Sequence, residues 1–321
     1  MKRTLTIVAV LLLAMAIAAP AIAEPITINY VTFVPRMHGI AKVLKADLDE
    51  IAEKSGGRLA FNYRGGPEAM KVPAQAMGVR TGAVDMACTS PDFYGKMVKG
   101  IEALDLSRIP VFKHREIGLY DYLNTKFNPV GIQFLMMVPK EQGTMFHFFT
   151  KKPVKKVADF KGMSLAGTGI FDEIGPALGM VPVATEMAEQ YSAMEKGIIE
   201  VCRGGLDSVM AFKLFEVANY IVKPGFGSAP ASLFLNLEKF NSMPKDLQDY
   251  LVDSLYTMAP ASERKHNAII EGATKAALKN GMKIMELEDK NEFLKIVYDA
   301  LYRNAAKDDP ETAKKIYELT H

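Results

Sequence analysis

The stretch that decides the fold is PITINYV at 25–31, followed by IAKVLKADLDEIAEK at 40–54 and RLAFNY at 58–63. The first segment alternates and is rich in β-branched residues, which predicts a strand. Apolar residues in the second segment recur with helical spacing, at Val43, Leu44, Leu48, Ile51 and Ala52. Ser55-Gly56-Gly57 ends this helix, and 58–63 is predicted as a second strand. The order indicates the start of a parallel α/β unit.

The same alternation of strands and helices continues outward from this stretch. A helix around 69–80 and a short strand at 83–88 complete a β-α-β-α-β lobe. A second set of elements begins near Met145, with strands predicted at 146–150, 163–166, 181–184 and 198–202, and helices at 171–178 and 186–196. The chain then becomes mostly helical, with helices predicted at 247–255, 262–279, 291–302 and 310–319, and one strand at 283–287.

Two segments far apart in the chain resemble each other. Residues 76–85 and 192–200 each contain a helix end, a glycine and an apolar strand. This similarity supports two lobes, although two unrelated α/β units would produce it equally well. Cys88 and Cys202 lie late on the two strands and could form one disulfide or remain two buried thiols. Because the cysteines are expected on opposite lobes, where a disulfide would lock them together, we predict free thiols.

Composition and charge limit the class of protein. The chain has 321 residues, of which 49% are apolar and 24% charged, and a mean hydropathy near zero, which is typical of a soluble globular protein. Residues 1–23 are predicted to be a secretory signal peptide, and an N-terminal membrane anchor is the alternative. Loss of Lys2 and Arg3 with the signal lowers Lys+Arg from 39 to 37, equal to the 37 Asp+Glu. No bulk charge therefore favours nucleic acid or anionic lipid.

Catalytic motifs are absent from the sequence. The five histidines form no His-Glu-x-x-His helix, and there is no Gly-x-Ser-x-Gly elbow or Walker loop. Gly167-Thr168-Gly169 is predicted to be an ordinary turn between strand and helix, because the third glycine of a dinucleotide fingerprint is missing. We therefore predict no catalytic residue, no metal and no cofactor. Two α/β lobes with polar loops at their strand ends suggest a hinged ligand cleft.

Several segments resemble the extracytoplasmic solute-binding proteins of TRAP transporters, of the DctP type. Their order and spacing carry the resemblance, through 51–58, 79–86, 152–153, 158–165, 178–183, 189–194, 230–236, Phe240 and 243–244. The resemblance implies a two-lobed α/β periplasmic-binding-protein architecture with hinge strands and helical C-terminal segments. We expect hinges near 144–146 and 225–228. The implied domains are a signal peptide at 1–23, lobe I at 24–145 and 227–268, and lobe II at 146–226 and 269–321.

The chain departs from the family pattern at the position that normally binds the ligand carboxylate. The family usually has an arginine directly after the Lys-Gly-Leu-Lys-Ile segment, and the matching residue here is Ala166. On a later strand, a family glutamate is replaced by Arg203, followed by Gly204. A planar guanidinium suits bidentate binding of a carboxylate. Arg203 is therefore expected to take over this role, and a solvated loop residue is the alternative.

The resemblance and the strand-end positions imply further ligand contacts. In the second lobe, His147, Met187 and Tyr191 match family positions near the ligand, and Asn236 matches a later strand. In the first lobe, the predicted contacts follow the first three strands: Phe33, His38, Glu68, Asp92 and Tyr94. For each first-lobe residue, a purely structural role in its loop is the alternative.

The implied function is that of a monomeric periplasmic receptor rather than an enzyme. It captures a small organic solute, expected to be an organic anion, and delivers it to a TRAP membrane permease driven by an ion gradient. The alternatives are a secreted sensor module without a permease and an extracytoplasmic enzyme. With Ala166 in place of the family arginine, the sequence does not identify the ligand.

Overall fold

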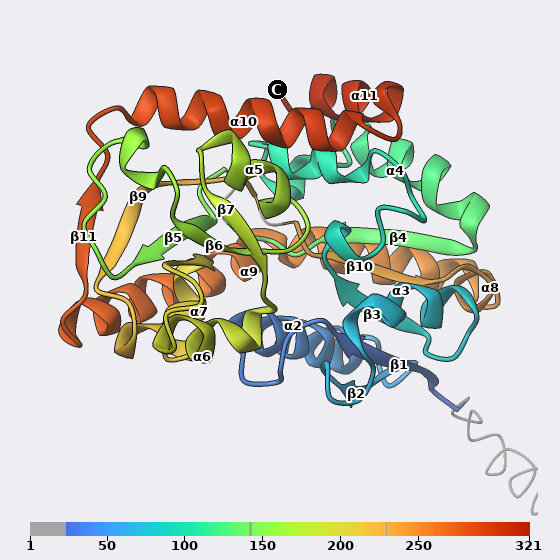
Figure 1. Cartoon of the computed structure of the whole chain (residues 1–321). Coiled ribbons are helices and arrows are strands. Elements are labelled where there is room, and N and C mark those ends of the chain that lie inside the picture. The colour runs from blue at the N-terminus through green and yellow to red at the C-terminus, as the bar shows by residue number, and fades with distance from the viewer. Residues whose placement is uncertain (1–23, 141–142, 229) are drawn as a thin grey trace, which may run out of the picture.

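A computed structural model describes residues 24–140, 143–228 and 230–321, so the predicted signal peptide lies outside the described residues. Two mixed sheets form the framework, side by side in Figure 1. The first has the order β2 (Leu59–Gly65), β1 (Ile26–Thr32), β3 (Met86–Thr89), β10 (Ser232–Asn236) and β4 (Ile132–Met137). The second has the order β11 (Lys283–Glu286), β9 (Tyr220–Phe226), β5 (Phe146–Thr150), β8 (Val201–Gly204), β6 (Ser164–Gly167) and β7 (Val181–Ala184). The predicted two-lobed α/β class is confirmed.

The first lobe is built on the segment from β1 to β2. Strands β1 and β2 pair in parallel, with Ile26 opposite Leu59, and β3 pairs in parallel on the other side of β1. Helix α2 (Gly39–Lys54) connects β1 to β2 and buries its apolar face, including Leu44, Leu48 and Ile51. The observed bounds agree with the predicted helix to within one residue.

The remaining helices surround the two sheets. The α-helices are α3 (Val72–Arg80), α4 (Leu119–Phe127), α5 (Phe171–Ala177), α6 (Gln190–Glu195), α7 (Leu206–Ala211), α8 (Leu237–Asn241), α9 (Lys245–Lys279), α10 (Lys290–Ala306) and α11 (Pro310–Thr320). Short 3₁₀ turns are η1 (Pro91–Phe93), η2 (Ile101–Leu106), η3 (Val111–Lys113), η4 (Asn128–Val130), η5 (Val157–Phe160), η6 (Met187–Glu189) and η7 (Leu214–Glu216). Among the described residues, no helix has the length and apolarity that crossing a membrane requires.

Two chain segments cross between the sheets next to each other. The segment after β4 enters β5, and the segment after β9 returns to β10. They are joined by backbone hydrogen bonds from Val138 to Ala231 (2.7 Å) and from Met145 to Gly227 (2.9 Å). The predicted hinge segments coincide with these crossings; motion about them stays a prediction.

Helix α9 connects the two lobes and differs from the prediction. The sequence predicts two helices separated near Pro260, whereas α9 is continuous through this proline. The helix packs against α2 beside the first sheet and against α7 beside the second. This packing on both lobes keeps the helix continuous although a proline removes one backbone hydrogen bond.

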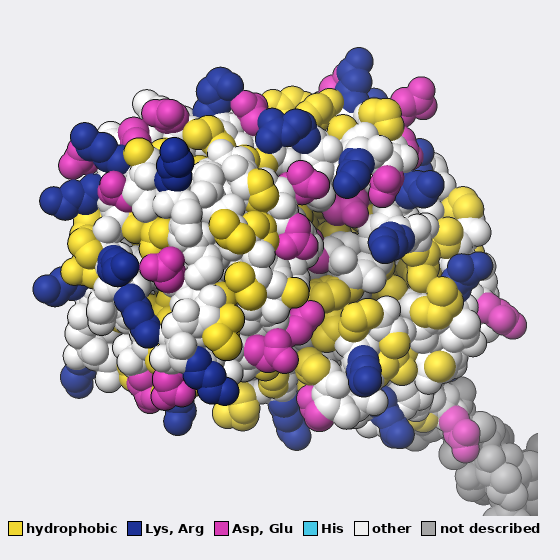
Figure 2. Space-filling view, in the orientation of Figure 1, with side chains coloured by type: hydrophobic (Ala, Val, Ile, Leu, Met, Phe, Trp, Pro, Cys, Tyr) yellow, Lys and Arg dark blue, Asp and Glu magenta, His cyan; other side chains and the backbone are white. Residues whose placement is uncertain are grey.

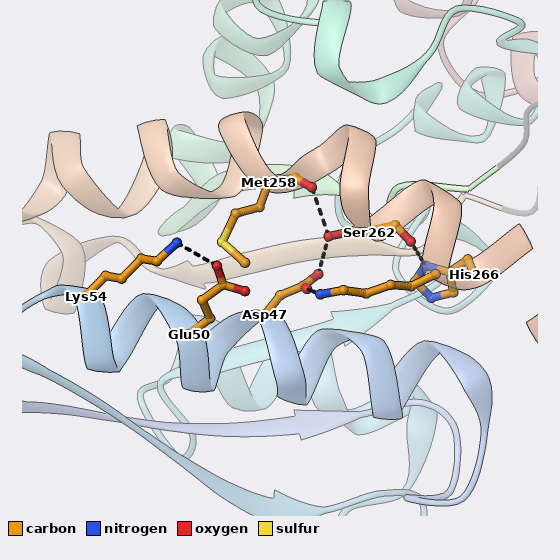
Figure 3. A network of polar contacts seen from close by, with 7 residues as sticks. Asp47, Glu50, Lys54, Met258, Ser262 and His266 are labelled. Atoms are coloured by element: carbon orange, nitrogen blue, oxygen red, sulfur yellow. Dashed lines mark hydrogen bonds and ion pairs between the residues drawn. The ribbon is translucent and has the colours of Figure 1, made fainter. Parts of the chain in front are cut away.

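A polar network joins α9 to α2 (Figure 3). The Ser262 hydroxyl donates to the Asp47 carboxylate (2.5 Å), and the Lys265 ammonium pairs with the other Asp47 oxygen (2.9 Å). The Ser262 carbonyl lies 3.1 Å from His266 Nδ1. The buried Ser262–Asp47 bond and the more exposed Lys265–Asp47 pair hold α9 against α2, whereas the Ser262–His266 contact lies within α9.

The C-terminal helices do not belong to one lobe alone. The predicted division places 269–321 in lobe II, and its boundary at 268 falls inside α9. Helix α10 packs against α5 and β9 but also against η2, which precedes β4. Helix α11 packs against η2, α4 and α10. The C-terminal segment therefore covers both lobes in Figure 1, and the predicted domain boundaries remain a proposal.

Candidate functional site

Arg203 is a buried cation at the carboxyl end of β8. Its side chain is held within the second lobe, because Nε donates to the Ala166 carbonyl (3.3 Å) and Nη2 donates to the Thr168 hydroxyl. The guanidinium lies 4.5 Å from the centroid of the Phe171 ring, in a cation–π contact. Its backbone N–H donates to the Gln190 side-chain carbonyl (2.8 Å). Only 8% of the Arg203 surface is exposed, so Arg203 is not a solvated loop residue, which was the alternative to a ligand-binding role.

Asp92 approaches this group from the first lobe. It lies in η1, which follows β3 after Ser90, and its carboxylate accepts a hydrogen bond from the Ser90 hydroxyl (3.3 Å). The carboxylate packs so closely on Gly169 that a Cβ at this glycine would lie 2.9 Å from the Asp92 carboxyl carbon. Gly169 also has a φ of +60°, so the close approach of the lobes and the backbone conformation both favour glycine here.

The charges of Asp92 and Arg203 influence each other across the two lobes. Burial lowers the pKa of Arg203, and the nearby charges of Asp92, Glu186 and Asp172 oppose that shift. Burial raises the pKa of Asp92, and the charge of Arg203 opposes that shift. For both groups burial outweighs the attraction, which is the usual situation when charges lie in a closed, poorly hydrated site.

A second polar cluster joins the lobes nearby. His38 caps α2 in the first lobe, and its Nε2 lies 3.5 Å from the Asp207 carboxylate at the start of α7. Lys140, which follows β4, is 2% exposed. Burial lowers its pKa to about 8, against the opposing charges of Asp207 and Asp105. This cluster adds a second buried cation between the lobes.

His147 and Gly204 meet on adjacent strands of the second lobe. They are paired in the register of β5 and β8. The His147 ring is buried against Gly225, where an added Cβ would lie 2.5 Å from the ring. Its Nδ1 has no hydrogen-bond partner within the described part of the chain. Gly204 has a φ of +153°, and a Cβ there would contact the Met187 methyl at 3.3 Å, so Met187 lies beside the end of β8.

Four further predicted contacts have hydrogen bonds within the protein itself, and their role in ligand binding stays a prediction. Tyr94 is 2% exposed and donates to the Ser232 hydroxyl (2.7 Å) in the first-lobe core. Asn236 caps α8 and lies beside Asp85, at the end of the sheet opposite to Thr89. Glu68 accepts the backbone N–H of Gly66 (2.7 Å) within its own exposed loop. The Tyr191 hydroxyl donates to Glu216 in η7 (2.9 Å).

The last predicted contact, Phe33, is partly buried against the first-lobe core, and its backbone N–H donates to the Cys88 carbonyl (2.9 Å). Its role in ligand binding stays a prediction. The predicted residues described above around the contact between the lobes are Arg203, Gly204, His147, Met187, His38 and Asp92.

Sequence reasoning missed Thr168, Gln190, Lys140 and Asp207. Thr168 lies in the Gly167-Thr168-Gly169 turn after β6, so its position at a strand end was a usable signal. The other three lie in segments without a motif, and only the packing of the two lobes brings them to the site.

The cysteines and the cavities bear on other possible sites. Cys88 in β3 and Cys202 in β8 are free and buried, on different sheets, as predicted. Within the described ranges, no group of three or more His, Cys, Asp or Glu residues could hold a metal ion. Two cavities lie elsewhere: one between α2, α9 and the first sheet, and one of about 440 Å³ on the second lobe, around Lys152, Lys155 and Lys161. Neither is lined by Arg203 or Asp92.

Two sheets joined by paired crossings, with opposite charges meeting between them, define the class of two-lobed α/β binding proteins. The chain belongs to the bacterial extracellular solute-binding proteins of family 7, the DctP family, whose model matches residues 32–308. Solved structures of TRAP periplasmic solute-binding proteins share its fold.

Relatives and solved structures agree with this assignment. The 2,3-diketo-L-gulonate-binding periplasmic protein YiaO of Escherichia coli is 24% identical over 279 residues, which cover 83% of this chain and 82% of YiaO. A solute-binding protein of Albidiferax ferrireducens is 25% identical over 255 residues, which cover 75% of this chain and 73% of that protein. The TRAP periplasmic solute-binding protein of Desulfovibrio salexigens with bound orotic acid has a TM-score of 0.78 at 18% identity, and covers 92% of this chain and 97% of its own. At that identity the last comparison concerns the fold alone.

Proposed function

We propose that this protein is a monomeric periplasmic receptor that captures a small organic acid between its lobes and delivers it to a TRAP permease. The observation that carries the proposal is the meeting of Arg203 and Asp92, from opposite lobes, at the carboxyl ends of β8 and β3. In open α/β sheets, ligands bind beyond the carboxyl ends of strands. The secretory signal, the permease partnership and the absence of catalysis are parts of this proposal.

Buried polar atoms near these strand ends support a ligand site. The Thr89 hydroxyl at the end of β3 and His147 Nδ1 on β5 are buried and have no hydrogen-bond partner among the described residues. Buried polar groups in proteins almost always have a partner, so such atoms call for a bound molecule or water. YiaO, named for 2,3-diketo-L-gulonate, and the structure with orotic acid support an organic acid as that molecule.

The test measures whether an organic acid binds and whether its binding brings the two lobes closer together. The protein without its signal is screened by thermal shift against uronates, orotate, dicarboxylates, 2-oxo acids, 2-hydroxy acids and amino acids. We expect at least one acid to raise the melting temperature and, at saturation, to reduce the radius of gyration in X-ray scattering. Binding without any compaction would contradict capture between the lobes. Turnover of a bound acid would contradict a receptor role.

A further inference from the structure

Arg203, Lys140 and Asp105 are buried in the inter-lobe region, and Asp92 and Asp207 are half-buried there. Arg203 and Lys140 are its buried cations, and the nearby charges that act on them come from Asp92, Asp172 and Glu186, and from Asp207 and Asp105. Asp172 and Glu186 lie at the exposed edge, where solvent screens them. The charges of Asp92, Asp105 and Asp207 remain to offset the two cations. The face in Figure 2 likewise has Asp and Glu side chains beside the hollow near its middle.

Other titratable groups nearby are three histidines, Glu102 and Lys223, a half-buried cation that acts on His147. Burial lowers the pKa of His147 and of His266 to about 4, and burial also lowers the pKa of His38, so the three imidazoles are neutral near pH 7. Glu102 is one more carboxyl close to Asp92. Burial raises its pKa to about 7, and the charge of Asp92 adds to that shift.

Arg203 is already engaged by groups of the protein. Its contacts with Ala166, Thr168 and Phe171 come from its own lobe, and Asp92 faces it from the other lobe. A second carboxylate, brought by a solute, would therefore meet the repulsion of Asp92. A cationic nitrogen on the same solute would remove that repulsion, because it supplies the positive charge that Asp92 then lacks.

We propose that the solute is a zwitterion, namely a small organic acid that also carries a cationic nitrogen, as an amino acid does. This inference rests on the proposed function and specifies its substrate class. The carboxylate of the solute lies toward Arg203 and Lys140, and its cationic nitrogen lies toward Asp92. A dicarboxylate with the same carbon skeleton would instead bring a second negative charge toward Asp92.

Matched solutes test the proposal. Titration calorimetry compares L-amino acids with the 2-hydroxy acids of the same skeleton, which differ only in the cationic nitrogen, and with dicarboxylates. We expect the preferred amino acid to bind at least tenfold more tightly than its 2-hydroxy counterpart. If 2-hydroxy acids or dicarboxylates bind as tightly, the zwitterion proposal is overturned and the receptor function stands. If no acid of any series binds, both proposals fail.

A charge variant separates selectivity from structure. Asp92→Asn keeps the shape of the side chain and is expected to weaken amino-acid binding at least tenfold, with no loss for the 2-hydroxy acid. The control is Asp49→Asn, which removes an exposed carboxylate that pairs with Lys45 on α2 (2.6 Å). The control should leave both affinities unchanged. Equal weakening of both acids by Asp92→Asn would show a merely structural role for Asp92 and contradict the proposal.

Discussion

The α3–β3 unit of the first lobe and the α6–β8 unit of the second lobe have similar local structure and opposite charge. Each helix is followed by a glycine in the left-handed region, Gly82 with φ +75° and Gly197 with φ +73°. Both strands are buried, and burial raises the pKa of each strand's cysteine thiol to about 12. The first unit then leads to Asp92 and the second ends in Arg203. A repeated scaffold thus presents an anion on one lobe and a cation on the other.

The two charges also differ in how they are held. Arg203 lies within β8 and has contacts inside its own lobe, whereas Asp92 lies beyond β3 in η1, accepts a hydrogen bond from Ser90 and also packs on Gly169 of the opposite lobe. This difference suggests that the cation is a fixed part of the second lobe.

The largest effect is expected for Arg203→Ala. The change removes the contact with Phe171 and leaves the Ala166 carbonyl and the Thr168 hydroxyl without their donor, so the free energy of unfolding should fall by about 1–3 kcal/mol. Urea unfolding measures this loss. Arg58→Ala is the control, because Arg58 and its partner Asp246 are both exposed (2.6 Å), and solvent-exposed pairs contribute little to stability. Equal losses in the two variants would mean that Arg203 is not an integral part of the second lobe.

Acid should destabilise the two lobes to a similar extent. Burial lowers the pKa of His114 in the first lobe and His147 in the second from 6.5 to about 4. The unfolded chain therefore binds more protons between these values. The contribution of each histidine to the free energy of unfolding is fully present above pH 6.5. It is lost as the pH drops toward 4, by about 1.4 kcal/mol per pH unit for each histidine.

Single variants with glutamine in place of each histidine test this symmetry. Urea unfolding at several pH values between 4 and 7 should show a shallower decline for His114→Gln and for His147→Gln than for the natural chain. A decline that stays unchanged in one variant would show that the histidine of that lobe is not buried in neutral form.

The smallest effect concerns the paired glycines. An added Cβ at Gly82 or Gly197 meets nothing within 4 Å, so alanine at either position is opposed only by the left-handed backbone conformation. That conformation costs about 1–2 kcal/mol for a residue with a side chain. Both variants should lose this amount, measured by thermal unfolding. The control Gly272→Ala, in the open interior of α9, should be stabilising instead, by about 0.5–1 kcal/mol. Unequal losses of stability at Gly82 and Gly197 would show that the α3–β3 and α6–β8 units are not structurally equivalent.

Local patterns in the sequence were sufficient for most of the elements. The strands at 146–150 and 181–184 have the predicted bounds, and α2, α5 and α11 agree to within one residue. Spacing of apolar residues and glycine stops act over a few residues, so they can be read without the fold. The break predicted near Pro260 was wrong, because packing of α9 on both lobes outweighed a local signal.

The sequence by itself determined the two-lobed α/β class and singled out Arg203 beside the unusual Ala166. Only the tertiary structure decided which residues meet. It brought Asp92 to Gly169 and His38 to Asp207, and it placed Asn236 at the far end of its sheet. The physical reason is that strand and helix formation depends on neighbours in the chain, whereas the environment of a charge depends on groups that are distant in the chain and adjacent in space.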